Sequence, residues 1–239
     1  MNKINNFVYI ALIEMHTVAG HILRAINGFP YSHVTFSFDE DFARCHAIQT
    51  LSEHTPFIAN YVNENLSYYV INNDKEKEIR IVKYKIPVTA EEIISMQKFI
   101  DEYSNDTENL YNMFSAGTYL ITGGFRIYKT MICGEFVAKL LSCAASVKLP
   151  KPYYKMFPKD FYKALEEYKM YEGILDTSNI ERDESDIHFA KIKTLNYMKK
   201  TLYIIGELTY RLIFKRVSPK FDYKKARITE QDVRRGKNG

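Results

Sequence analysis

Several residue types and patterns that mark particular classes of protein are scarce or absent in this chain. Its 239 residues include no tryptophan, and its three cysteines are an odd number without a CxxC spacing. That pattern indicates neither a disulfide framework nor a structural zinc site. No run of about 18 uncharged apolar residues occurs, so no membrane-spanning helix is expected. The phosphate-binding patterns GxGxxG and GxxxxGK followed by Ser or Thr are also absent, which leaves nucleotide binding by such loops unsupported.

The composition is that of a globular protein with an uneven distribution of charge. Hydrophobic residues make up 46% and charged residues 26% of the chain, which excludes an intrinsically disordered protein. Residues 191–239 contain 14 Lys and Arg against 4 Asp and Glu, a balance of +10, whereas the preceding 190 residues have a balance of −6. We therefore expect a domain over residues 1–175 and a basic helical extension with a tail over residues 176–239.

The apolar run over residues 7–13 raises the question of a targeting segment. Glu14 ends the run, only Lys3 precedes it as a basic residue, and no small-residue cleavage site follows. A secretory signal needs these features, so the run is interpreted as a buried strand. Together with the unpaired cysteines, this predicts a cytoplasmic protein.

Hydrophobic periodicity predicts an α+β fold with a small antiparallel sheet. Strands are expected over residues 7–13, 33–38, 42–48, 68–72 and 78–86. Helices are expected over residues 17–26, from Thr89, from Cys133 and over residues 158–165, with a loop over residues 117–124. In strand 33–38 the apolar residues alternate with a polar face, expected to be accessible, that carries His33.

Cys133 and His33 are the residues whose setting points to chemistry. Cys133 lies where an irregular segment becomes a helix with an apolar stripe, and the positive end of a helix dipole favours a thiolate. A histidine from a neighbouring strand can take the proton of that thiol. The free N–H groups of the first helical turn can then stabilise an oxyanion. This combination is what a cysteine hydrolase requires.

Each of these residues also has a purely structural interpretation. A cysteine in an apolar helix is usually a small core residue, and this is the interpretation we give to Cys143 and Cys45. A single histidine on a strand is more often a hydrogen-bonded structural residue than a base. Residue type and spacing alone leave both interpretations of Cys133 and His33 open.

Two blocks of sequence resemble a known family. Residues 16–39 read HTVAGHILRAINGFPYSHVTFSFD, and residues 131–141 read MICGEFVAKLL. In this order they resemble the two main blocks of the circularly permuted NlpC-type papain-like family, the branch that includes YiiX-like proteins and, more remotely, the lecithin:retinol acyltransferase group. Tyr111-Asn112 and Pro158-Lys-Asp160 resemble lesser signatures, so the resemblance covers about residues 17 to 165.

The resemblance implies a papain-like α+β core with reordered segments, in which His33 is the base and Cys133 the nucleophile. A third polar group normally orients the imidazole from the strand after the His strand. Its candidate here is His46, although a structural role for His46 is nearly as well supported. Gly134 replaces the serine that usually follows the nucleophile but keeps the backbone N–H. Glu135 is interpreted as an acid of the first helical turn without a catalytic part.

The remaining candidates have weaker support. Tyr31 and Ser32, directly before the base, could line the cleft or simply form the turn. No histidine has a partner at metal-ligand spacing, so we assign neither a metal nor a cofactor.

The basic extension contains an amphipathic pattern. Six residues follow a 3-4-3-4-3 spacing with basic residues beside them: Leu195, Met198, Leu202, Ile205, Thr209 and Leu212. Such a helix either packs on the core with a solvated basic face or contacts an anionic membrane surface or a partner groove. We expect the tail beyond Pro219 to be mobile. Nucleic acid is not an expected partner, because no binding module is recognisable.

The sequence thus predicts a thiol hydrolase or acyltransferase that acts on an amide or ester bond through an acyl-enzyme. The substrate class is a small molecule, a peptide or a lipid-like compound. The alternative is a catalytically silent binding protein on the same scaffold, which could also be peripheral to a membrane.

Overall fold

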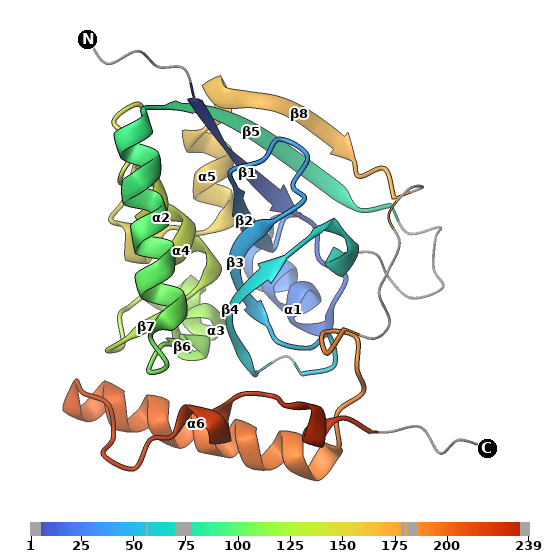
Figure 1. Cartoon of the computed structure of the whole chain (residues 1–239), viewed down its shortest axis with the longest axis vertical. Helices are drawn as coiled ribbons and strands as arrows, with labels where there is room; N and C mark the ends of the chain where they lie inside the picture. Colours follow the sequence, from blue (N-terminus) through green and yellow to red (C-terminus); the bar gives the residue numbers. More distant parts are fainter. Residues whose placement is uncertain (1–5, 56, 70–77, 178–179, 181–185, 235–239) are drawn as a thin grey trace.

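An antiparallel sheet of six strands runs through the centre of the computed structural model, which describes residues 6–55, 57–69, 78–177, 180 and 186–234 (Figure 1). Its strands in spatial order are β4 (Ala59–Glu64), β3 (Cys45–Thr50), β2 (His33–Ser37), β1 (Asn6–Ile13), β5 (Arg80–Val88) and β8 (Lys169–Ile174). A separate short parallel pair consists of β6 (Leu110–Tyr111) and β7 (Thr130–Met131). The expected class, a mixed fold with a small antiparallel sheet, is confirmed.

Helices lie against the sheet and below it (Figure 1). The α-helices are α1 (Val18–Asn27), α2 (Ala90–Asn105), α3 (Met113–Thr122), α4 (Cys133–Leu141), α5 (Pro158–Ala164), α6 (Thr194–Phe214) and α7 (Tyr223–Ala226). Short 3₁₀ turns are η1 (Leu66–Tyr69), η2 (Tyr153–Lys155), η3 (Glu166–Tyr168) and η4 (Glu230–Asp232).

Strand β1 is central because both of its faces are covered. Ile10 and Leu12 belong to the main core with α2 and α4. Ala11 and Ile13 point the other way, into a second cluster that contains Tyr69 of η1. Burial on both faces explains why this strand is a continuous apolar run rather than an alternating one.

Helices α2 and α4 begin where their sequences indicate. Thr89 accepts a hydrogen bond from the backbone N–H of Glu92, whose carboxylate accepts one from the N–H of Thr89. This reciprocal capping box explains the start of α2. In α4, Phe136, Val137 and Leu140 are fully buried against the sheet, as the stripe from Cys133 predicts.

Several expected elements differ in the structure. Strands β4 and β8 were not predicted, and the expected strand 68–72 is instead the end of η1, with its later residues outside the described part of the chain. The expected loop 117–124 lies mostly in α3, because the Asn112 side chain accepts from the N–H of Ser115 and begins the helix there.

The polar face of β2 is not accessible, contrary to expectation. His33, Thr35 and Ser37 are all buried. Their cross-strand partners on β1 are Ile13, Ala11 and Tyr9, which lie in the second cluster. The face is polar because it carries a buried hydrogen-bonded site, not because it meets water.

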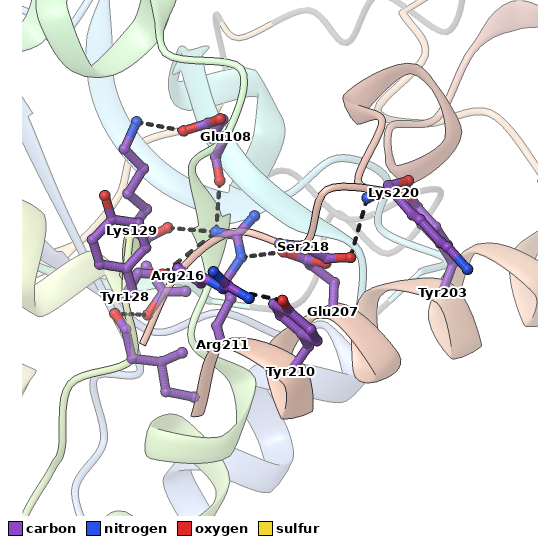
Figure 2. Close-up of polar contacts among 12 residues, drawn as sticks. Glu108, Tyr128, Lys129, Tyr203, Glu207, Tyr210, Arg211, Arg216, Ser218 and Lys220 are labelled. Carbon is purple, nitrogen blue, oxygen red and sulfur yellow. Dashed lines mark hydrogen bonds and ion pairs between the residues drawn. The ribbon is translucent and has the colours of Figure 1, made fainter. Parts of the chain in front are cut away.

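The basic extension packs on the preceding part of the chain through a buried arginine (Figure 2). Arg211 of α6 donates to Glu207 Oε1 at 2.6 Å and to the carbonyl oxygen of Glu108 at 2.7 Å. It also donates to the carbonyl oxygen of Lys129 at 3.1 Å. These bonds fasten α6 to the β6–β7 pair, and Leu208 joins the same apolar cluster as residues of both parts.

The amphipathic stripe of α6 does not form this contact. Leu195 and Leu202 are 62% and 66% exposed, and Met198 and Leu212 are exposed as well. The helix packs on the rest of the chain, which was one of the two expectations. It does so through the face that carries Arg211, so the apolar stripe faces outward. Among the described residues, no helix has the length and hydrophobicity needed to cross a bilayer.

The segment after Pro219, expected to be mobile, is ordered as far as it is described. It forms α7, and Val233 makes an antiparallel bridge with Ile192. The N–H of Lys193 donates to the carbonyl oxygen of Asp232. The segment is ordered because Ala226 and Ile228 are buried in the same apolar cluster as Ile204 and Leu208 of α6.

Candidate active site

Cys133 and His33 come together although 100 positions separate them in the chain. Cys133 is the first residue of α4 and His33 the first residue of β2. The two side chains line the same small pocket, and the proximity of Cys133 is one of the causes that raise the pKa of His33. Both residues line a pocket of about 40 Å³, whose other walls come from α1, β3 and β6. They are 9% and 3% exposed, so the pair is nearly closed off but still borders a hollow.

A buried carboxylate holds the other side of the imidazole. Nε2 of His33 lies 3.0 Å from Oε1 of Glu64, at the end of β4. The hydroxyl of Tyr69 donates to the same oxygen. Because Nε2 is engaged by Glu64, Nδ1 is the ring nitrogen that is left to interact with the thiol. The ring therefore lies between a carboxylate and a sulfur, the order that a base and its orienting group require.

The electrostatics of the pair follow from this arrangement. Burial lowers the pKa of His33, but the charge of Glu64 and the hydrogen bonds with Cys133 and Glu64 outweigh it and raise that pKa to about 10. Burial raises the pKa of Glu64, but the His33 charge and the hydrogen bonds from His33 and Tyr69 lower it below its ordinary value. At neutral pH the site holds an imidazolium and a carboxylate.

His46 is not the group that orients His33. Its Nδ1 lies 2.7 Å from the hydroxyl oxygen of Tyr61, and its ring packs against Phe36 and Phe38. The register pairs His46 with Phe36, and side chains alternate between the two faces of a strand. His46 therefore lies on the face opposite to His33, and Glu64 replaces it as the third group.

Gly134 is required by a close backbone approach. A Cβ at this position would lie 2.2 Å from the carbonyl oxygen of Met156, far inside van der Waals contact. A serine cannot be accommodated there, because any side chain with a Cβ would meet this oxygen. The segment around Met156 packs against the start of α4 and restricts the helix that carries Cys133.

Glu135 stabilises the start of the same helix. Its Oε2 accepts a hydrogen bond of 3.0 Å from the backbone N–H of Ile132, as expected for an acid of the first turn. Burial raises the pKa of Glu135 to about 8, while the Ile132 hydrogen bond and the Arg126 charge act in the opposite direction.

Tyr31 and Ser32 have different positions relative to the pocket. Ser32 lines it, and its Oγ accepts from the N–H of Met15 at 3.3 Å. Tyr31 is not one of the lining residues. Its hydroxyl donates to Glu172 at 3.3 Å, and its ring stacks on Tyr162.

Gln49, which lines the pocket, and Glu64, which holds the imidazole of His33, are the site residues that the sequence interpretation missed. Gln49 of β3 is buried and lines the pocket. Within the described part of the chain, neither its Oε1 nor its Nε2 has a hydrogen-bond partner. The expected strand ended at residue 48 and β4 was not expected, so neither residue had a place in the predicted site.

No metal cluster accompanies this site. Over the described ranges, no group of three or more His, Cys, Asp or Glu side chains is arranged to hold a metal ion. No protein-family model, curated protein or solved structure matches this chain.

The close approach at Gly134 predicts a large loss of stability for Gly134→Ala. The added methyl group meets a backbone oxygen that cannot rotate away, so we expect a loss of about 2–3 kcal/mol in the free energy of unfolding. Gly117 of α3 is the matched control, because a Cβ there meets nothing within 4 Å. Gly117→Ala should raise stability by about 0.5–1 kcal/mol. Urea unfolding measures both, and equal midpoints for the two variants contradict the packing.

The buried ion pair predicts a particular pH dependence for Glu64→Gln. The pKa of His33 is raised from its ordinary 6.5 to about 10, so its contribution is full below pH 6.5 and lost as the pH rises toward 10. The pKa of Glu64 is lowered from its ordinary 4.5, so its contribution is present above pH 4.5 and lost in more acidic solution. The pair therefore stabilises the fold most between about pH 4.5 and 6.5.

We expect Glu64→Gln to cost about 3–5 kcal/mol at pH 5.5 and clearly less at pH 9.5. Denaturant unfolding at the two pH values measures the difference. Glu40→Gln removes an exposed carboxylate that pairs with Lys85 and should have a small effect at both. A cost for Glu64→Gln that grows with pH contradicts the assignment of the imidazolium.

Proposed function

We propose that the protein is a cysteine hydrolase or acyltransferase with Cys133 as nucleophile, His33 as general base and acid, and Glu64 as the orienting group. One observation carries the proposal. The thiol at the start of a helix contacts an imidazole whose other nitrogen is held by a buried carboxylate. A structural cysteine needs no such partner, whereas an activated one does.

The reaction proceeds through an acyl-enzyme. His33 holds the proton that the thiol loses, and the sulfur attacks the carbonyl carbon of an amide or ester. The new carbon–sulfur bond remains, and the bond to the leaving amine or alcohol breaks. In this step His33 gives its proton to the leaving group. Water, or another acceptor, then loses a proton to His33 and attacks the acyl group. Cleavage of the carbon–sulfur bond releases the product and restores the thiol.

Two kinds of donor are available for the oxyanion. The first N–H groups of α4 have no partner within the helix, and they adjoin Cys133. The amide of Gln49 lines the same pocket and has no partner among the described residues. Donors fixed in this way stabilise the developing charge without reorganising.

A permuted papain-like core is part of this proposal. What supports it is the helix that begins at the cysteine, the strand that begins at the histidine, and the order of His33 before Cys133 in the chain. The orienting group comes from β4, two strands away from β2 in the sheet.

The pocket suggests where a substrate lies. About 40 Å³ admits a small group such as a carbonyl rather than a whole substrate. We propose that the remainder extends over α1, which lines the pocket through Gly20 and Leu23, and over α3, which contacts α1; these helices expose Ile22, Leu120 and Ile121. An exposed apolar rim of this kind favours a substrate with a lipid-like or apolar peptide portion.

The proposal predicts selective alkylation of Cys133. Iodoacetamide at pH 7 should modify Cys133 faster than Cys45 and Cys143, since burial raises the pKa of both other thiols. Peptide mass mapping measures the rate at each site. His33→Gln should lower the Cys133 rate at least tenfold, because the variant lacks the imidazole that takes the thiol proton in the proposed mechanism.

His46→Gln is the matched control and should leave the Cys133 rate unchanged. Equal rates in wild type and His33→Gln contradict the enzyme and favour the alternative, a binding protein on this scaffold without turnover.

A specific observation favours contact with a membrane surface as a second function. The apolar stripe of α6 faces outward, and a hollow beside it is lined by Lys199, Lys224, Lys225 and Arg227. An apolar helix face bordered by lysine and arginine is the pattern of helices that lie on anionic bilayers. A second copy of the chain fits less well, because two basic extensions would repel each other.

Flotation with vesicles tests this function. Vesicles that contain phosphatidylserine should carry the protein upward at low salt, and the bound fraction should fall at high salt. Leu195→Ser with Leu202→Ser should reduce binding, whereas Ile94→Ser, at a similarly exposed position on α2, should not. Equal binding by both variants, no binding at low salt, or a dimer in light scattering contradicts this function.

A further inference from the structure

A second and larger hollow lies on the other side of the catalytic helix. Its volume is about 630 Å³, and it is enclosed by α2, residues 126–131, the first turn of α4, η2 and the end of α6. We call it the Arg126 pocket. It is separate from the Cys133 pocket, because the two have no lining residue in common. Its volume is in the range of sites for small molecules.

Three buried polar groups on the walls of this pocket lack partners. They are Tyr103 Oη, Glu135 Oε1 and Arg211 Nη2, which have no hydrogen-bond partner within the described residues. All three side chains are at most 6% exposed. Unpaired buried polar groups are costly and rare in native proteins. Each of these atoms has less than 1 Å² of accessible surface, so a group bound in the pocket reaches it only when the wall opens around it.

Arg211 shows the pattern most clearly (Figure 2). Its Nε is taken by Glu207, and its Nη1 by carbonyl oxygens that include those of Glu108 and Lys129. Nη2 alone is left over. These partners take up three of the five N–H bonds of the guanidinium and fix its plane, which leaves the two N–H bonds of Nη2.

The charges at the pocket select for an anion. Arg126 lies against the rings of Tyr153 and Tyr154, with Cζ 5.6 and 5.8 Å from their centroids. Neither Arg126 nor Lys215 forms an ion pair with a described carboxylate, whereas Lys129 is neutralised by Asp106 and Glu108.

Glu135 does not cancel this charge. Burial raises its pKa to about 8, so its carboxyl group is mostly protonated at neutral pH and its free oxygen can take part as a neutral hydrogen-bonding group. The pocket thus offers two uncompensated cations and buried donors.

The rest of the wall is largely apolar. Ile127, Met131 and Leu212 line it together with the tyrosine rings. Flat apolar walls bind a planar hydrophobic body, and the cations bind an acidic group attached to it.

We propose that the Arg126 pocket binds a small ligand that carries a phosphate on a planar apolar body. Phosphate fits better than carboxylate because its three oxygens can accept from several converging donors at once. The ligand meets the exposed side chains of Arg126 and Lys215, and the three unpartnered groups lie deeper in the wall, where they pair with it if the wall opens.

The site has a connection to Cys133 through Glu135, which lines the Arg126 pocket. Oε2 of Glu135 accepts from the N–H of Ile132, the residue before Cys133, while its Oε1 has no partner within the described residues. A ligand that bonds Oε1 acts on the residue that stabilises the start of the catalytic helix. This coupling rests on the proposed function, but binding itself does not.

Isothermal titration with phenyl phosphate tests the binding. The full chain should bind phenyl phosphate saturably, inorganic phosphate more weakly, and phenol not at all. Benzoate, added as a separate arm, distinguishes a requirement for phosphate from a general preference for acids. Arg126→Gln should weaken the binding of phenyl phosphate at least tenfold. Because Arg126 is exposed, the variant should fold normally, and an unchanged thermal midpoint verifies this.

Two controls separate the possible outcomes. Lys163→Gln, in a different hollow, should bind as wild type does. Cys133→Ala should also bind normally, so loss of thiol reactivity leaves this site standing. Absence of saturable binding, equal affinity in Arg126→Gln and Lys163→Gln, or equal binding of phenol overturns the proposal. Tighter binding of benzoate than of phenyl phosphate overturns the choice of phosphate.

Discussion

Burial of the Glu64 carboxylate is the constraint on which the rest of the site depends. A carboxylate removed from water is strongly unfavourable unless its charge and lone pairs are satisfied. His33 and Tyr69 supply the partners, from β2 and η1. The same contacts turn the imidazole edge toward Cys133. Stability and chemistry thus come from one ion pair, because the cation that makes Glu64 tolerable is also the cation beside the sulfur.

Local signals predicted the elements that carry Cys133 and His33 but not the element that carries Glu64. The stripe after Cys133 and the alternation after His33 are strong short-range patterns. The expected elements left residues 49–67 without structure, and a connection of that length inside a domain argues against the assignment. Tyr61 and Val62 favour a strand there, yet only the register with β3 shows that Glu64 shares a face with His33.

The basic extension shows a different limit of sequence interpretation. Apolar spacing indicates which face of α6 is hydrophobic, but the face that packs carries Glu207 and Arg211. A buried arginine with a carboxylate and backbone carbonyl partners has no signature in a hydropathy pattern, because its charge marks it as a surface residue. The partners lie about 100 positions earlier in the chain. Only the fold brings them together, and it leaves the more apolar face exposed.

The first turn of α4 lies between the Cys133–His33 site and the Arg126 pocket. Successive helical residues point about 100° apart, so Cys133, Gly134 and Glu135 face three different neighbours. The sulfur meets His33, the glycine allows the Met156 carbonyl to approach, and the carboxyl group lies between the Ile132 N–H and the Arg126 pocket. Because these residues are consecutive, the position of the sulfur depends on all three contacts. A change on either side of the helix therefore reaches the nucleophile through a single turn of backbone.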